Sequence, residues 1–109
     1  MRPLAIYLLS TLIVLASGSA SAEDFKVGMA NWLFAPALVT IKVGDRVLWV
    51  NDDDSHHKVN FEDPSIKSSV DLKPGKEYAI VFDKPGEFGY ACQYHKDYGM
   101  KGKVLVKDK

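Results

Sequence analysis

Short runs of alternating apolar and polar side chains, or of β-branched side chains, recur between residues 25 and 107. They predict short β-strands, because a strand points successive side chains to opposite faces. Six segments carry the pattern: 25–32, 38–43, 46–51, 76–82, 88–92 and 103–107. Turn residues separate several of them, namely Gly44-Asp45, Pro74-Gly75 and Pro85-Gly86. No stretch after residue 22 shows a helical period. The pattern therefore indicates an all-β chain.

The number of predicted strands limits the fold architectures that fit the chain. With the segment that leads to Phe61, we expect about seven or eight short strands with regular turns between them. Such a series favours an all-β, two-sheet antiparallel β-sandwich. A small barrel is the structural alternative.

The first 22 residues have a different composition and predict a secretory signal peptide. Arg2 supplies a charged start, residues 4–16 form an apolar stretch, and Ala20-Ser21-Ala22 is a small-residue cleavage site. A membrane anchor is the alternative, but a spanning helix needs about 20 apolar residues, and Ser10 and Ser17 interrupt this segment. We therefore expect a mature domain over 23–109 that is periplasmic or secreted and does not span the membrane.

The mature part is small and nearly neutral. Its 87 residues suffice for one domain, and its 13 basic and 14 acidic side chains give a formal charge of −1. Nucleic acid is not an expected partner, because a basic surface would be needed. A single cysteine, Cys92, is unusual in an exported protein, where cysteines are usually paired. Binding of a metal would protect this thiolate from oxidation.

Cys92 opens a short run that contains three metal-binding side chains. His95 and Met100 follow it within nine residues, and a further imidazole is available upstream at His56 or His57. Two His and one Cys with a weak axial Met form the ligand set of a mononuclear blue copper centre, which transfers single electrons. The joint spacing is the signal, since Met100 alone could fill a core and His95 alone could lie on the surface.

Strand parity chooses between the two adjacent histidines. If the segment is extended, His57 shares a face with Val59 and Phe61, whereas His56 lies on the polar face. His57 is therefore the expected ligand. The same parity turns Cys92 inward with the apolar side chains of strand 88–92.

These residues resemble the cupredoxin family of small type 1 blue copper proteins, and their spacing is most similar to that of plastocyanins and pseudoazurins. The resemblance extends over the mature chain and rests on three stretches: 44–51, His57-Lys58-Val59, and 84–92 followed by His95, Met100 and Gly102. It implies a Greek-key sandwich that holds one copper ion through His57, Cys92, His95 and Met100. It also implies that the protein shuttles single electrons between redox partner proteins, without a small-molecule substrate. We expect a monomer and no enzyme activity.

A docking surface follows from the same resemblance. Trp32 is expected near the copper end of the sandwich, and Tyr94 and Tyr98 lie in the ligand loop. An exposed apolar patch of this kind marks an interaction surface. The nearby basic residues Lys58, Lys96 and Lys101 would steer an acidic partner. Trp32 could instead be a core residue.

Two other functions use similar residues. A copper-handling protein for storage, delivery or resistance would also use soft ligands, and His56 with Asp52, Asp53 and Asp54 could form a second, exchangeable site. An enzyme could use Cys92 with His95 as nucleophile and base. Copper oxidases, however, need more histidines than this chain has, and structural zinc sites use Cys and His without a thioether.

Overall fold

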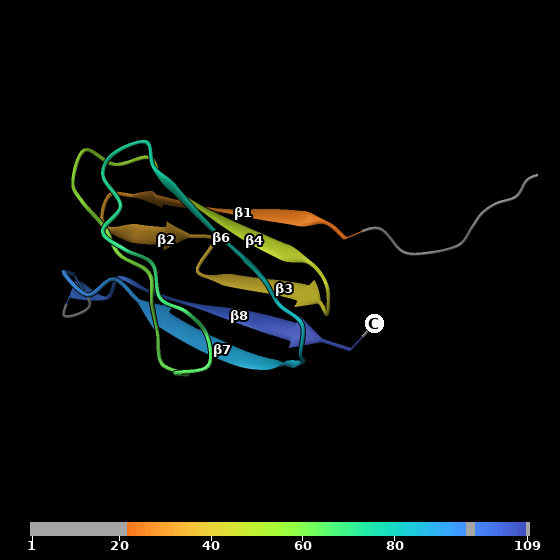
Figure 1. Ribbon diagram of the computed structural model, residues 1–109. Helices are drawn as coiled ribbons and strands as arrows, with labels where there is room; N and C mark the ends of the chain where they lie inside the picture. Colours follow the sequence, from red (N-terminus) through yellow and green to blue (C-terminus); the bar gives the residue numbers. More distant parts are fainter. Residues whose placement is uncertain (1–21, 96–97, 109) are drawn as a thin grey trace, which may run out of the picture.

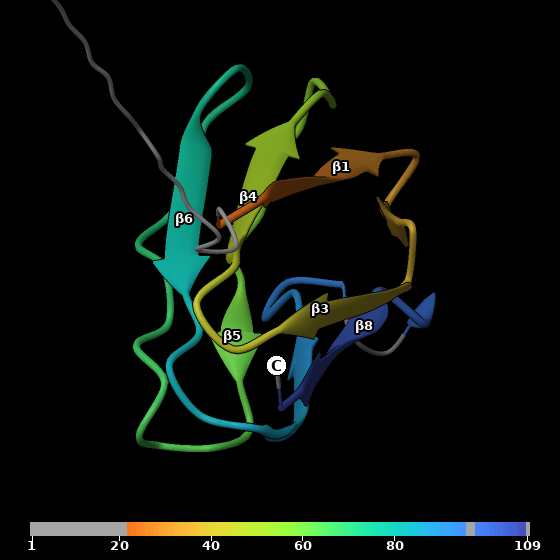
Figure 2. The same ribbon diagram turned by 90° about the vertical axis from the view of Figure 1, so that its right-hand side faces the viewer.

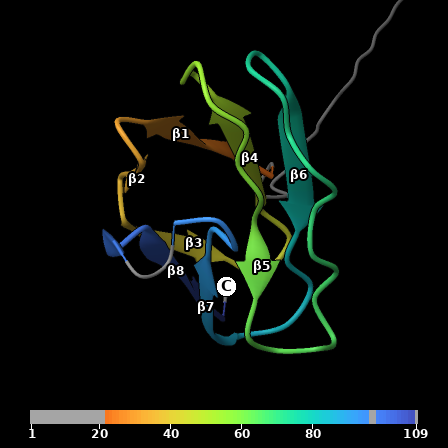
Figure 3. The same cartoon turned by 90° about the vertical axis from the view of Figure 1, so that its left-hand side faces the viewer.

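The computed structural model describes residues 22–95 and 98–108, which form two four-stranded sheets packed face to face (Figure 1). The strands are β1 (Asp24–Ala30), β2 (Leu33–Ala35), β3 (Leu38–Lys42), β4 (Arg46–Asn51), β5 (Asn60–Phe61), β6 (Glu77–Val81), β7 (Gly86–Ala91) and β8 (Lys101–Lys107). One sheet has the order β2-β1-β4-β6 and the other β3-β8-β7-β5. Views from the two ends show both sheets surrounding a common interior (Figure 2, Figure 3).

The two-sheet sandwich predicted from the pattern is confirmed, and each sheet proves to be mixed. β1 pairs in parallel with β4, and β3 pairs in parallel with β8. The other pairs are antiparallel. Parallel pairing of β1 with β4 arises because the chain passes to the other sheet as β3 before it returns.

The first predicted strand is shorter than expected. It ends at Ala30, because Asn31 and Trp32 form a two-residue turn that leads into β2. Both turn residues have positive φ, 55° and 59°, and Ala30 pairs with Leu33 across the turn. This is the backbone conformation of a type I′ hairpin loop.

Inward-facing aromatic side chains form much of the core. In β4, Val47 and Trp49 are fully buried, whereas Arg46, Leu48 and Val50 are half-buried. The ring of Trp49 meets the edge of Tyr90 from β7 at a centroid distance of 5.3 Å and that of Phe61 at 5.6 Å. Edge-to-face pairs at such distances add stability beyond the area that they bury.

Gly102 leaves space for one of these rings. It lies opposite Tyr90 in the β7–β8 register, and a Cβ atom at this position would come within 2.4 Å of the Tyr90 hydroxyl oxygen. Tyr90 is 1% exposed, and burial raises the pKa of its hydroxyl to about 12. Glycine here lets the ring cross the neighbouring strand just before the chain reaches Cys92.

The expected signal peptide lies, except for Ala22, outside the described residues, and so does Lys96. Among the residues that are described, no helix has the length and apolar character needed to cross a membrane.

Candidate metal centre

The loop that joins β7 to β8 folds back on itself at one end of the sandwich. The Cys92 N–H donates to the Met100 carbonyl oxygen at 3.0 Å, which extends the β7–β8 pairing by one step. Within the loop, the His95 N–H donates to Cys92 O at 3.2 Å and the Met100 N–H donates to His95 O at 3.3 Å. These bonds bring three predicted ligands onto one short, closed loop, and the side chains of Cys92 and Met100 are fully buried.

The fourth predicted ligand comes from a distant segment. His57 and Leu72 exchange backbone hydrogen bonds of 3.0 and 2.8 Å, so His57 is fixed in a short antiparallel bridge. Asn51, at the end of β4, donates from Nδ2 to Leu72 O and to Ser55 O, both at 2.9 Å. This buried amide therefore links the segment just before His57 to the segment that pairs with His57.

Burial separates the two histidines as parity predicts. The His57 side chain is fully buried, whereas that of His56 is 52% exposed. His56 pairs through Nδ1 with Asp71 Oδ2 at 2.7 Å. Among the residues that the structure describes, His56 forms no metal-type group with Asp52, Asp53 and Asp54.

Three possible metal-binding atoms lie close together: Nδ1 of His57, Nδ1 of His95 and Sγ of Cys92. The Nδ1 atoms of His57 and His95 each lie 3.7 Å from Cys92 Sγ, and the three donor atoms lie within 4.8 Å of one another. With metal–nitrogen bonds of about 2.0 Å and metal–sulfur bonds of about 2.3 Å, a trigonal ion separates sulfur from each nitrogen by about 3.7 Å. The spacing and the soft donor set therefore fit one copper ion. In the described part of the chain, this is the one group of three or more His, Cys, Asp or Glu side chains arranged for a metal.

Asp53 orients the buried histidine. Its Oδ2 atom lies 2.9 Å from His57 Nε2, so the carboxylate holds the proton on that nitrogen and leaves Nδ1 free to face Cys92. The hydrogen bond from His57 lowers the pKa of the Asp53 carboxyl, which keeps the carboxylate charged. A carboxylate bonded to the far nitrogen of a metal-binding histidine fixes its tautomer and raises its basicity as a ligand.

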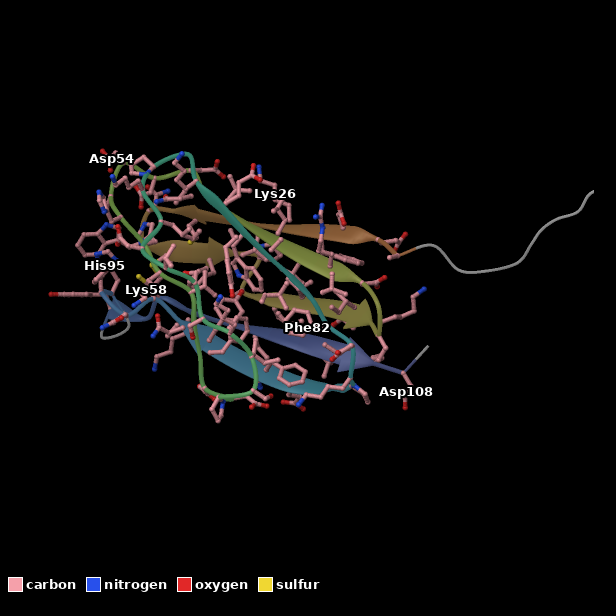
Figure 4. The ribbon with its side chains drawn as sticks, in the orientation of Figure 1. Lys26, Asp54, Lys58, Phe82, His95 and Asp108 are labelled. Carbon is pink, nitrogen blue, oxygen red and sulfur yellow. The ribbon has the colours of Figure 1, made fainter. Side chains whose placement is uncertain are left out.

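His95 lies nearer the surface, with different surroundings. Burial, followed by the neighbouring His57, lowers the pKa of His95, so both effects favour the neutral imidazole that a metal requires. Its ring stacks on the indole of Trp32 at a centroid distance of 4.0 Å. His95 and Lys58 lie at the same end of the sandwich, opposite Asp108 (Figure 4).

The predicted docking residues gather partly around this end. Trp32 is 42% exposed, so it is not a core residue, and Tyr94 and Tyr98 are also exposed. The Tyr98 ring lies 5.6 Å from that of Trp32, and the Tyr94 hydroxyl donates to Asp71 Oδ1 at 2.7 Å. Among the predicted basic residues, Lys58 donates to the Gln93 side chain, Lys101 is exposed, and Lys96 lies outside the described residues.

Sequence reasoning missed the role of Asp53. Three consecutive aspartates precede His57, and composition does not distinguish the one that turns inward. The spacing of four residues between Asp53 and His57 was the available signal, but it identifies a partner only when the conformation of the loop is known.

Comparison with known proteins agrees with this geometry. A family model described as a cupredoxin-like domain matches residues 3–106. Chloroplastic plastocyanin from Tetradesmus obliquus is 37% identical over 101 residues, with 82% of this chain and 70% of the relative covered. Amicyanin-alpha from Methylorubrum extorquens is 32% identical over 113 residues, with 94% and 93% covered.

Solved structures show the same likeness. A purple cupredoxin from Nitrosopumilus maritimus superimposes with a TM-score of 0.70 at 26% identity, and the match covers 77% of this chain and 100% of that one. Since the family model spans most of the chain and the plastocyanin and amicyanin relatives match at 37% and 32% identity, the chain belongs to the cupredoxin-like family.

Proposed function

We propose that this protein is a mononuclear blue copper protein that shuttles single electrons between redox partner proteins, with one copper ion bound by His57, Cys92, His95 and Met100. Bound copper would supply a one-electron Cu(I)/Cu(II) couple. The observation that carries the proposal is the group of two imidazole nitrogens, each 3.7 Å from a buried thiol.

The protein supplies a fixed environment in which His57, Cys92 and Met100 are fully buried. Cys92 provides a thiolate from the end of β7, and His57 and His95 turn the same nitrogen, Nδ1, toward it. Met100 is fully buried in the same loop and would supply a thioether as a fourth, weaker ligand. Because the backbone bonds of the loop and the Asp53 carboxylate hold these side chains, little rearrangement is needed when the charge of the site changes.

Retention of the metal separates electron transfer from copper handling. A buried ligand set on a closed loop favours a metal that stays in place, whereas a storage or delivery protein must release it. The copper-loaded protein should take up and give back one electron per molecule through repeated cycles with a chemical reductant and oxidant. It should keep its copper against a competing chelator meanwhile. Loss of copper to the chelator or to an apo-protein within minutes would support copper handling instead.

Partner docking is proposed at the end of the sandwich where His95 lies. The exposed rings of Trp32, Tyr94 and Tyr98 supply apolar contact area, and Lys58, Lys96 and Lys101 supply positive charge. The rate of electron transfer to an acidic partner should then fall as salt is added. A rate that rises with salt would contradict this steering. In this role the protein is a monomeric electron carrier and not an enzyme.

We also propose that residues 1–22 are removed on export and that residues 23–109 act in the periplasm or outside the cell. The charged start, the apolar stretch and Ala20-Ser21-Ala22 support this proposal. N-terminal sequencing of the protein from its native compartment should begin at Glu23. A protein that retains Met1 there would contradict it.

A further inference from the structure

Trp32 occupies a backbone conformation that is costly for a tryptophan. Its φ of 59° lies in the left-handed region, and the second position of a two-residue type I′ loop strongly favours glycine. Such strain persists only where the surrounding structure imposes it, and it is concentrated at functional sites. The strained turn places the Trp32 side chain next to His95.

The indole of Trp32 covers the imidazole of His95. The ring centroids are 4.0 Å apart and the ring planes are inclined by only 24°, so the two rings are stacked. Two further contacts fix the indole: Trp32 Nε1–H donates to Ser55 Oγ at 3.2 Å, and the ring of Tyr98 lies beside it. Trp32 is therefore held over one face of His95 although it is partly exposed.

The two imidazoles of the site are held by different means. A carboxylate bonds the far nitrogen of His57, whereas the described side-chain hydrogen bonds of His95 include only the contact with Cys92. The stacked indole is the nearest of three rings packed against His95, since the rings of His57 and Tyr94 lie at centroid distances of 5.1 and 6.3 Å. Aromatic stacking of this kind is worth more than the area that it buries.

One carboxylate oxygen connects both restraints. Asp53 Oδ2, which accepts from His57 Nε2 at 2.9 Å, also accepts from the backbone N–H of Trp32 at 3.2 Å. The Asp53 carboxylate therefore fixes His57 directly and also holds the turn that places the indole on His95. Residues from the β1–β2 hairpin and from the loop after β4 are joined at this single atom.

We propose that Trp32 is a positioning residue for His95, and we call its stacked indole the clamp. Asp53 couples this clamp to His57, so that the two imidazoles are oriented as one unit. This inference rests on the copper site proposed above and adds a residue that binds no metal itself.

The decisive variant is Trp32→Gly, because it keeps the hairpin turn and removes the indole that stacks on His95. Glycine after Asn31 is the sequence that this type of turn prefers, so the hairpin should form at least as well as in the native chain. Trp32→Phe is the conservative variant and keeps an aromatic ring. Val81→Ala, an exposed position of β6 paired with Arg46, serves as a surface control.

The first measurement uses metal-free protein, so it does not depend on copper. In NMR spectra, the His95 ring protons should be shifted upfield by the indole in the native chain, shifted partly in Trp32→Phe, and unshifted in Trp32→Gly. Thermal unfolding should show that Trp32→Gly remains folded. An unshifted His95 ring in the native chain would overturn the clamp, whatever metal the site binds.

The second measurement uses copper-loaded protein. In competition with a Cu(I) chelator, Trp32→Gly should bind copper about two- to tenfold more weakly, which corresponds to the loss of one aromatic pair, and Trp32→Phe should recover most of this affinity. The reduction potential of Trp32→Gly should also shift, while that of Val81→Ala stays unchanged. A native protein that turns blue, with a Trp32→Gly variant of unchanged affinity and potential, would overturn the clamp and leave the proposed function intact.

A double-mutant comparison tests the coupling. If Asp53 places the indole, Trp32→Gly should weaken copper binding less in the Asp53→Ala background than in the native background. Equal factors in both backgrounds would show that Asp53 and Trp32 act independently.

Discussion

Removal of the Asp53 carboxylate tests how the protein orients a buried ligand. In Asp53→Ala, the Nε2–H of His57 loses its partner at 2.9 Å, and His57 is fully buried, so water cannot readily replace the lost acceptor. The imidazole should then rotate or adopt the other tautomer for part of the time. We expect both copper affinity and the stability of the metal-free protein to fall.

The size of the effect follows from two independent considerations. A buried donor left without a partner costs about 1–3 kcal/mol. Loss of the partner of a metal-binding histidine lowers metal affinity by about 10- to 100-fold, which equals about 1.4–2.7 kcal/mol. Loss of the bond from the Trp32 N–H also loosens the turn that places the indole on His95, so the effect on copper affinity should lie toward the upper end of this range. Asp53→Ala should therefore weaken copper binding by about 10- to 100-fold.

Chelator competition measures the affinity, and urea unfolding of the metal-free protein measures the stability. Asp54→Ala is the matched control, since Asp54 is the next residue and its side chain is exposed. This control should change copper affinity less than twofold, on the order expected for an exposed side chain. An Asp53→Ala protein with the affinity of Asp54→Ala would refute the argument that the carboxylate fixes His57.

Three further variants probe other parts of the molecule. His57→Ala should abolish the blue colour of the copper-loaded protein and His56→Ala should keep it; equal loss in both would refute the assignment from parity. Gly102→Ala should destabilise the fold by about 1–3 kcal/mol in urea unfolding, because its Cβ would clash with the buried Tyr90 ring, and native stability would contradict that packing. Asp45 accepts hydrogen bonds from the backbone N–H groups of Glu23 and Lys42, and these bonds lower its pKa below the usual 3.8. The stabilisation from the Asp45 carboxylate is therefore complete above pH 3.8 and is lost as the pH falls through the folded-state pKa. Asp45→Asn should thus be less stable than the native chain at pH 7, and the urea midpoints of the two proteins should converge as the pH falls below 3.8. A constant difference would show that this carboxylate is not responsible.

Alternation of side chains predicted the sandwich because it reports directly which face of a strand is buried. Phe88, Tyr90 and Cys92 share one face by parity, and all three are buried. β2 could not be predicted, since Trp32 stands in a turn position where glycine is the usual signal. The parallel pairing of β1 with β4 depends on contacts between distant segments, which no local pattern encodes.

The candidate ligands were predictable for a related reason. Cys92, His95 and Met100 lie on one loop, so their spacing is visible in the sequence, and parity distinguished His57 from His56. The residues that orient these ligands come from elsewhere in the chain. Asp53 looks like its two acidic neighbours. Trp32 was expected near the copper end from the resemblance, but its stacking on His95 depends on a turn that the sequence does not signal.

The visible absorption spectrum of the purified protein, loaded with copper and oxidised, tests the central claim most directly. A Cu(II) ion bound by two imidazole nitrogens and the Cys92 thiolate should give an intense charge-transfer band at about 600 nm, as expected for a blue copper site. The band should disappear on one-electron reduction, return on reoxidation and be absent from Cys92→Ser. A colourless Cu(II) protein, or a band that survives in Cys92→Ser, would contradict the proposed site.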